Sequence, residues 1–322
     1  MSASRGERAL AWCWLGIRCA RLLAALPVQL WRVWRGSRRL MAAYRSTVEP
    51  MIAARVTVRE REAEVRDRLA GWALQGGYLV DSYARVLGRC DAAELAVVAG
   101  SFTRLYDDVL DEEADAGIGE RLARLFNGDE VLACSDIEWL AGDLFRWLAS
   151  RVPEPHGEML YERLRELHGL QLERADAASQ PTCEEVAQLA VRKGGAAMAI
   201  LGGLVSPHAD ARELGVLCRL GGVLQLIDDY DDAFEDEGVC TSANWSRVPF
   251  GTLAAELRIA SREIVRLHGR RRAAAFVDGL HCWLVLVGLR RLHDRVRAVA
   301  AGPVAAPRSG VAMIAARKPH IR

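Results

Sequence analysis

Two aspartate-rich segments lie inside otherwise apolar, helix-periodic stretches of this 322-residue chain, and they constrain its fold more than any other feature. Their carboxylates recur at helical spacing, so like charges lie one turn apart on the same helix face and repel each other. They are Asp107, Asp108 and Asp111 in the first segment and Asp228, Asp229, Asp232 and Asp236 in the second. An apolar helix that keeps such a row of charges is expected to bind a compensating cation.

Magnesium is the cation that these carboxylates suit best. Their oxygens are hard ligands, and Mg²⁺ binds to proteins through a few of them together with phosphate oxygens and water. Two such helix faces on opposite sides of a cavity would hold a trinuclear Mg²⁺ cluster on a diphosphate, and the metal would polarise a leaving group. The alternative is that each segment is an ordinary solvated helix face.

The rest of the chain predicts helices and no strands. Three capping-box sequences precede apolar-periodic runs, at Asp91–Glu94, Ser135–Glu138 and Thr182–Glu185. Glycine and proline separate these runs, and no long alternation of β-branched residues is present. We therefore predict an all-α fold, with one main domain at residues 45–301 and a flexible tail at residues 302–322.

The N-terminal segment, residues 1–44, predicts a basic amphipathic helix added to the main domain. Nine arginines and one acidic residue fall within residues 1–45. Arg18 and Arg21 argue against a transmembrane span, since each would cost roughly 2.5–3.5 kcal/mol at a bilayer centre, and Pro27 would break the helix. Two interpretations stay open, a peripheral anchor in the membrane interface or a helix packed on the domain with solvated arginines.

Charge and cysteine content exclude several classes of protein. Lys and Arg total 43 against 42 for Asp and Glu, so the chain as a whole is not a general binder of nucleic acid or other polyanions. Its eight cysteines form no CxxC pair, which leaves no signal of a zinc knuckle or a thioredoxin-like motif. Scattered single cysteines are typical of a reducing compartment, and we expect a cytoplasmic protein.

The sequence from Leu220 to Asp232 resembles the second aspartate-rich motif of the class I isoprenoid synthases, including the Gln225 that precedes the acidic turn. Members of that superfamily carry two such motifs on facing helices of an all-α bundle. The resemblance spans roughly residues 75–240, and the paired motifs are more specific for the superfamily than for any of its branches. It implies a Mg²⁺-dependent enzyme whose substrate is a prenyl diphosphate.

Further residues fit the same resemblance. Arg192 and Lys193 lie where family members place a cation that binds the diphosphate, often at a helix break, and Gly194 would support such a break. These two cations are the expected catalytic residues, and a surface pair at a helix kink is the alternative. The expected substrate contacts are Phe102, Arg104, Gln171 and Gln225. Candidates for the lining of an apolar, water-excluding cavity are Phe102, Met198, Leu201 and Leu224, and simple core packing is the alternative for each.

Departures from the family pattern favour one branch. Chain-elongating members carry a Gly-Gly-Lys-Arg stretch for a second substrate, whereas Gly76 and Gly77 are followed by no basic residue. Asn244 and Trp245 lie where elongating members often have Gly-Lys. We therefore expect a class I terpene synthase that ionises one allylic diphosphate. The alternatives are a prenyltransferase that joins two prenyl diphosphates and a non-catalytic homologue, and the sequence does not indicate substrate length, product skeleton or oligomeric state.

Overall fold

The computed structural model describes the backbone of residues 5–112, 117–129, 133–153, 156–175, 182–232 and 249–300. Side chains are described at residues 27–110, 117–129, 133–153, 156–172, 182, 184–231 and 249–293. Several residues singled out from the sequence lie outside these described side chains, namely Asp111, Asp232, Asp236, Asn244, Trp245 and the tail at residues 302–322.

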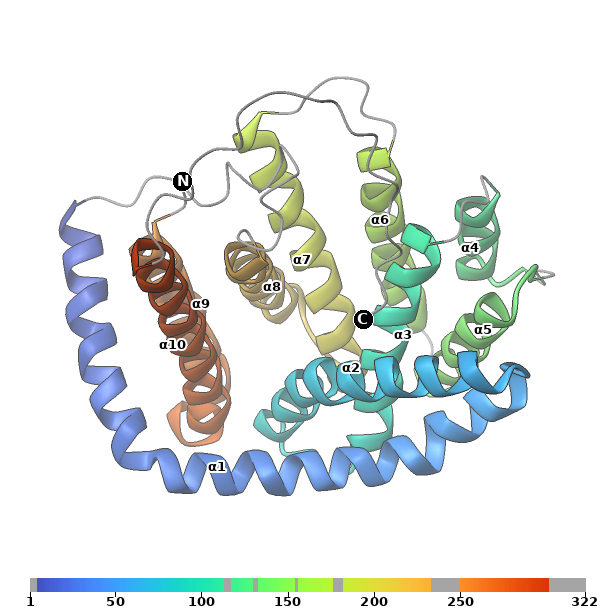
Figure 1. The fold of residues 1–322 in the computed structure, drawn as a ribbon, viewed down its shortest axis with the longest axis horizontal. Coiled ribbons are helices and arrows are strands. Elements are labelled where there is room, and N and C mark those ends of the chain that lie inside the picture. The colour runs from blue at the N-terminus through green and yellow to red at the C-terminus, as the bar shows by residue number, and fades with distance from the viewer. Residues whose placement is uncertain are drawn as a thin grey trace.

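The described chain folds into ten α-helices and contains no β-strand, which confirms the predicted all-α class. The helices are α1 (Arg5–Arg55), α2 (Arg59–Val86), α3 (Ala93–Glu112), α4 (Ile118–Phe126), α5 (Asp136–Ala149), α6 (His156–Ala175), α7 (Cys183–Val205), α8 (Ala211–Asp232), α9 (Phe250–His268) and α10 (Arg270–Ala300). In Figure 1, α1 follows two sides of the molecule, and α3, α6 and α7 run nearly upright. The aspartate-bearing end of α3 therefore lies toward the same side as the C-terminus of α6 and the N-terminus of α7.

Helix starts follow two of the three predicted capping sequences. Thr182 and Glu185 form the full reciprocal capping box at the start of α7. At the start of α5, the Ser135 side chain accepts a hydrogen bond from the backbone amide three residues on. These side chains satisfy amides that have no intrahelical partner in a first turn. Helix α3 instead begins at Ala93, two residues after the predicted Asp91.

Helix α1 continues through the predicted boundary between residues 44 and 45. Its second half packs on α2, α3 and α9 through one face of fully buried side chains at four-residue spacing, Leu40, Tyr44, Val48 and Ile52. Such a row is the apolar stripe of an amphipathic helix. Pro27, which was predicted to break the helix, lies inside α1, and Figure 1 shows α1 as a bent but unbroken helix. The predicted boundary is thus not the end of a helix.

Two helix pairs, α2 with α3 and α7 with α8, cross very closely because glycines lie at both crossings. A side-chain carbon at Gly100 would lie 2.8 Å from the backbone nitrogen of Gly77. One at Gly194 would lie 2.5 Å from the backbone oxygen of Gly221. Only glycine permits such an approach of two backbones. Each aspartate segment begins about two helical turns after the crossing glycine of its own helix, so these crossings position both segments.

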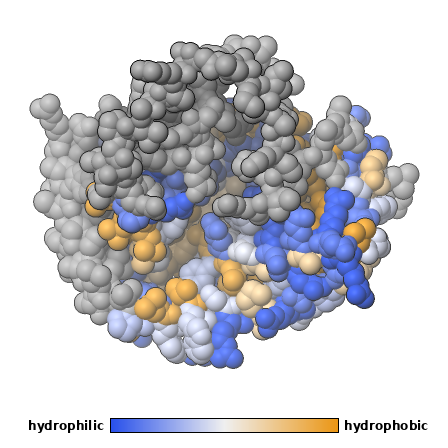
Figure 2. All heavy atoms as spheres, in the orientation of Figure 1, coloured by the Kyte–Doolittle hydropathy of each residue, from blue (hydrophilic) through white to orange (hydrophobic). Residues whose placement is uncertain are grey.

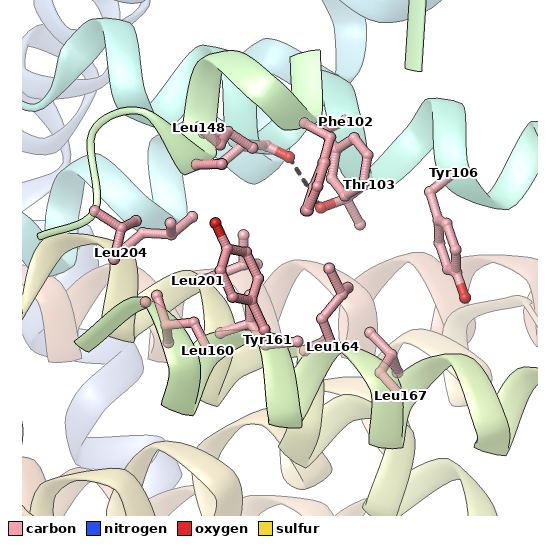
Figure 3. A pocket seen from close by; sticks show the side chains of 17 residues that line it. Phe102, Thr103, Tyr106, Leu148, Leu160, Tyr161, Leu164, Leu167, Leu201 and Leu204 are labelled. Carbon is pink, nitrogen blue, oxygen red and sulfur yellow. Dashed lines mark hydrogen bonds between the residues drawn. The ribbon is translucent and has the colours of Figure 1, made fainter. Parts of the chain in front are cut away.

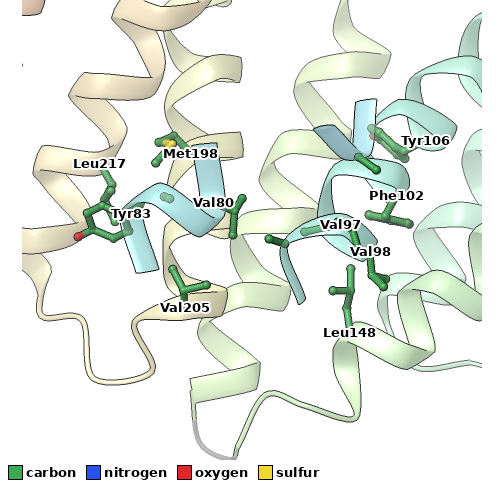
Figure 4. Close-up of a cluster of buried hydrophobic side chains, with 14 of the residues drawn as sticks. Val80, Tyr83, Val97, Val98, Phe102, Tyr106, Leu148, Met198, Val205 and Leu217 are labelled. Atoms are coloured by element: carbon green, nitrogen blue, oxygen red, sulfur yellow. The ribbon is translucent and has the colours of Figure 1, made fainter. Parts of the chain in front are cut away.

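The buried core continues through the molecule from the α2–α8 contact to the α3–α5 contact (Figure 4). Tyr83 of α2 lies near Leu217 of α8 at one end, and Val98 of α3 lies near Leu148 of α5 at the other. The Tyr83 hydroxyl donates to Glu213 at 2.6 Å, so the polar end of this buried ring is satisfied. On the α3–α5 side the apolar filling is incomplete and leaves a cavity.

Candidate functional site

An apolar cavity lies between α3, α5, α6 and α7 (Figure 3). It comprises about 710 Å³ of space not filled by atoms, including the part that is open to solvent. Its lining residues include Phe102, Thr103, Tyr106, Phe145, Leu148, Val152, Leu160, Tyr161, Leu164, Leu167, Ile200, Leu201 and Leu204. In Figure 3, Phe102, Thr103 and Leu148 lie on one side of the space, and Leu160 and Leu164 lie on the other. Walls of this composition suit a hydrocarbon ligand.

Two of the hydroxyl groups in the cavity wall have partners within the protein. The Thr103 hydroxyl donates to the carbonyl of Ala99 at 2.9 Å. The Tyr106 hydroxyl lies 2.8 Å from His168 Nδ1, and His168 Nε2 lies 2.8 Å from the carbonyl of Gly119. Since a carbonyl only accepts, Nε2 carries the proton and Nδ1 accepts from Tyr106. Burial lowers the pKa of His168 and raises the pKa of Tyr106, so both side chains are neutral near neutral pH.

Three polar side chains, Asp107, Gln171 and Lys193, each lie one helical turn beyond a cavity-lining residue of their own helix, and we call them the polar rim. Gln171 Nε2 donates to Asp107 Oδ1 at 3.4 Å, which joins α6 to α3. At the opposite end of α6, His156 lies 2.9 Å from the carbonyl of Gly203 of α7. Helices α6 and α7 are therefore antiparallel, and Lys193 falls at the same end as Gln171.

Asp108 faces α2 rather than the cavity. Its Oδ1 lies 2.6 Å from the guanidinium of Arg104, and its Oδ2 accepts a hydrogen bond from Arg68 of α2 at 3.1 Å. The Arg104 guanidinium also lies 5.6 Å from the ring centre of Trp72. Arg104 is thus placed in the α2–α3 contact, away from the polar rim. Metal binding by Asp108, as the sequence predicts, would compete with its two ion pairs.

The described part of the second aspartate segment lies in the last turns of α8, which ends at Asp232. Asp228 and Asp229 are half-buried, and Gln225 Nε2 donates to Asp229 Oδ1 at 2.9 Å. Gln225 therefore contacts its own helix, one turn before the acidic pair. Among the described residues, no three His, Cys, Asp or Glu side chains form a group that could hold a metal ion. The trinuclear clamp stays a prediction, because it also requires Asp111, Asp232 and Asp236.

Helix α7 is continuous, so the predicted break at Gly194 is wrong. Gly194 instead serves the close crossing with α8, where a side-chain carbon would lie 2.6 Å from Gln225 Cβ. The two cations that precede it differ in environment, since Arg192 is exposed and Lys193 is half-buried. Adjacent helix positions point about 100° apart. Lys193 shares the face of the cavity-lining Ala197, and Arg192 does not.

Gly76 and Gly77, the nearest counterpart to the elongation motif, also serve packing. A side-chain carbon at Gly76 would lie 3.3 Å from the Cα of Gly100. One at Gly77 would lie 3.2 Å from the backbone oxygen of Ala96. Both glycines therefore let α2 approach α3, and their backbone faces a helix rather than a substrate space.

The cavity wall contains Phe102 and Leu201 of the residues that the sequence suggested, together with several that it did not. Met198 lies in the α7–α8 contact instead, and Leu224 packs against the main core cluster. One signal was available for the α6 wall. Apolar positions recur at intervals of three or four residues before Gln171, and that periodicity predicts a single helix face. The periodicity does not indicate which neighbouring helix this face packs against.

Comparison with solved structures shows a remote likeness of fold. No protein-family model matches the sequence, and no curated protein matches it. The structure is similar to that of linalool/nerolidol synthase from Streptomyces clavuligerus, solved in complex with 2-fluorogeranyl diphosphate. The sequence identity is 15% and the TM-score is 0.47, and the match covers 78% of this chain and 94% of that chain. The likeness is one of fold, and it assigns neither an activity nor a substrate to this chain.

Proposed function

We propose that the protein is a Mg²⁺-dependent class I terpene synthase that ionises an allylic prenyl diphosphate. The observation that carries this proposal is the polar rim, Asp107, Gln171 and Lys193, placed one helical turn above an apolar, partly aromatic cavity. A ligand that fills both parts needs an anionic head and a hydrocarbon tail. A prenyl diphosphate has this form, with its reactive carbon at the junction of head and tail.

Carboxylates on two helices would supply the magnesium ligands. Asp107 of the polar rim on α3, and the pair Asp228 and Asp229 on α8 outside the rim, carry carboxylate oxygens, the ligands that Mg²⁺ prefers. Asp107 would hold metal from the α3 side and the α8 pair from the other. When bound, Mg²⁺ would neutralise the diphosphate and make it a better leaving group.

Lys193 is the residue best placed to bind the departing diphosphate. It is half-buried on the cavity side of α7, whereas Arg192 is exposed on another face. An amine held where negative charge develops stabilises the transition state without reorganising at that moment. Gln171 keeps the Asp107 carboxylate oriented by its hydrogen bond across the rim.

The cavity wall would protect a carbocation after the diphosphate leaves. Its lining side chains include no carboxylate, amine or imidazole. Of its three hydroxyls, those of Thr103 and Tyr106 are engaged by Ala99 and His168, and the third belongs to Tyr161, a weakly nucleophilic phenol. The rings of Phe102 and Phe145, with centres 6.0 Å apart, add aromatic faces that attract positive charge. The wall therefore favours rearrangement of the hydrocarbon over capture by a nucleophile.

The packing of α2 favours a single-substrate reaction. Gly76 and Gly77 are occupied by the contact with α3, so the nearest counterpart to an elongation motif has another role.

The four cysteines whose bonding state is described are free thiols, which supports a reducing, cytoplasmic location.

The decisive experiment is product analysis with a panel of prenyl diphosphates from geranyl diphosphate upward, with and without Mg²⁺. We expect diphosphate release and a terpene product from one allylic substrate alone, only when Mg²⁺ is present. Lys193→Ala should lower kcat by about 10²–10³, the usual loss for one preorganised group at developing charge. Arg192→Ala is the matched control and should stay active. A product that forms only after isopentenyl diphosphate is added would show a prenyltransferase, and no diphosphate release from any substrate would show a non-catalytic homologue.

A further inference from the structure

Residues 27–35 of α1 expose a cluster of large apolar side chains. Five of them have between 46% and 60% of their surface exposed, namely Val28, Leu30, Trp31, Val33 and Trp34. Single exposed apolar residues are common on proteins, but a gathering of this size on one segment indicates an interaction surface.

The outward face of this segment combines tryptophan with arginine. It consists of Trp31, Trp34, Arg35 and Arg38, at positions i, i+3, i+4 and i+7 of one helix, and we call it the Trp–Arg stripe. The guanidinium carbon of Arg35 lies 5.3 Å from the ring centre of Trp31, and that of Arg38 lies 5.0 Å from the ring centre of Trp34. Aromatic rings with cations beside them suit the boundary between hydrocarbon and polar headgroups of a bilayer.

The body of the protein holds the stripe in a fixed direction. Gly36 lies against Tyr78 of α2, where a side-chain carbon would be 3.0 Å from the ring. Arg39 forms an ion pair with Asp81 of α2, and Leu40 is fully buried. Gly36 lies within the stripe, and Arg39 and Leu40 follow it directly along α1, so the stripe is presented outward at a defined orientation.

Helix α10 adds a second exposed apolar row. Leu286, Leu289 and Leu292 are each 57–59% exposed, while Leu284 and Val287 on the other face are buried. Among the described residues, α10 contains the one stretch that is long and apolar enough to cross a membrane. Because one of its faces belongs to the core, α10 offers a surface for contact rather than a span.

The stripe and the leucine row belong to neighbouring helices. Burial raises the pKa of Tyr78, and both Arg32 of α1 and Cys282 of α10 lie close enough to act on the same hydroxyl. Leu286 follows Cys282 by one helical turn. Figure 2 shows, on the face it displays, polar side chains gathered toward α4 and α5 and apolar ones toward α9 and α10.

We propose that the Trp–Arg stripe and the exposed leucines of α10 form one surface that binds reversibly to an anionic lipid bilayer. Charge complementarity favours an anionic bilayer as the partner. Residues 1–45 hold nine arginines and one acidic residue, and lipid phosphates attract the arginines. A second copy docking through the same face would set arginines against arginines. The proposal does not rest on the enzymatic activity, so either can fail without the other.

The first test is co-sedimentation of the full chain with phosphatidylcholine vesicles, with and without phosphatidylglycerol. We expect binding that requires phosphatidylglycerol and weakens with added salt. The double substitution Arg35→Glu and Arg38→Glu should lower the partition coefficient at least about 25-fold, because each basic residue near an anionic surface contributes roughly fivefold. Arg271→Glu with Arg272→Glu, exposed at the start of α10, makes the same charge change and should bind like the parent chain.

The second test separates the bilayer from a protein partner. Trp31→Ala with Trp34→Ala should weaken vesicle binding, whereas Val58→Ala with Ile259→Ala, which removes exposed apolar groups elsewhere, should not. All of these side chains are exposed, so far-UV circular dichroism should be unchanged. Salt-independent binding, or equal binding by the stripe variants and their controls, would overturn the proposal. So would sedimentation velocity showing an oligomer that dissociates when Trp31 and Trp34 are removed, since a second copy would then cover the surface.

Discussion

Replacing Gly194 by alanine should destabilise the protein, although alanine is the better helix former. The new methyl carbon would lie 2.5 Å from the Gly221 carbonyl oxygen and 2.6 Å from Gln225 Cβ. A relaxed C···O contact is about 3.3–3.6 Å, so α7 and α8 would have to separate by roughly 1 Å. Because the obstacles are backbone and a Cβ atom, no rotamer change relieves the clash, and the cost falls at the upper end of overpacking, about 3 kcal/mol. The gain in helix propensity, about 1 kcal/mol, leaves a net loss of about 2 kcal/mol in the free energy of unfolding.

Gly215→Ala is the matched control. It also lies in a helix, α8, and nothing lies within 4 Å of the added carbon, so it should raise the free energy of unfolding by about 1 kcal/mol. Both variants share the propensity gain, and their difference of about 3 kcal/mol therefore isolates the clash. Urea unfolding followed by far-UV circular dichroism measures both values. If Gly194→Ala proved as stable as Gly215→Ala, the close crossing of α7 and α8 would be refuted.

Four further substitutions test the site. Asp107→Asn should lose most diphosphate release while its free energy of unfolding stays nearly unchanged. Asp108→Asn should also lower the free energy of unfolding, by about 1–3 kcal/mol, because two arginines lose a buried carboxylate. Activity assays and urea unfolding of both variants separate these two roles. Ala197→Phe places a ring in the cavity and should abolish turnover of long prenyl diphosphates before short ones, and a uniform loss across substrates would contradict the cavity as the tail site. Burial lowers the pKa of His168, so the unfolded chain binds its proton more tightly than the folded one. The stability that neutral His168 contributes is therefore complete above its unfolded pKa of about 6.5 and is lost as pH falls below that value. Unfolding measured across this range should show a slope that His168→Asn reduces, and an identical slope in both proteins would argue against the buried Tyr106–His168 pair as its source.

Local information in the sequence was sufficient for the helices and for locating the aspartate segments that we propose to carry the chemistry. Apolar spacing and the Thr182 capping box place helices because both act over a few neighbouring residues. The same locality explains the error at Gly194, since a glycine fits a helix break and a close helix contact equally well. The second helix of that contact, α8, decides between them, and the residues around Gly194 do not specify where α8 packs.

The sequence by itself determined that this chain is all-α, that two of its helices carry rows of aspartates, and that its N-terminal segment is basic. Tertiary structure decided the partner of each side chain. Asp107 and Asp108 are neighbours in the chain, yet one faces α6 at the polar rim and the other faces the arginines beside α2. Adjacent positions on a helix diverge by about 100°, so their environments depend on which helices pack on either side. The physical reason is that periodicity identifies a face of a helix, while only packing identifies what that face meets.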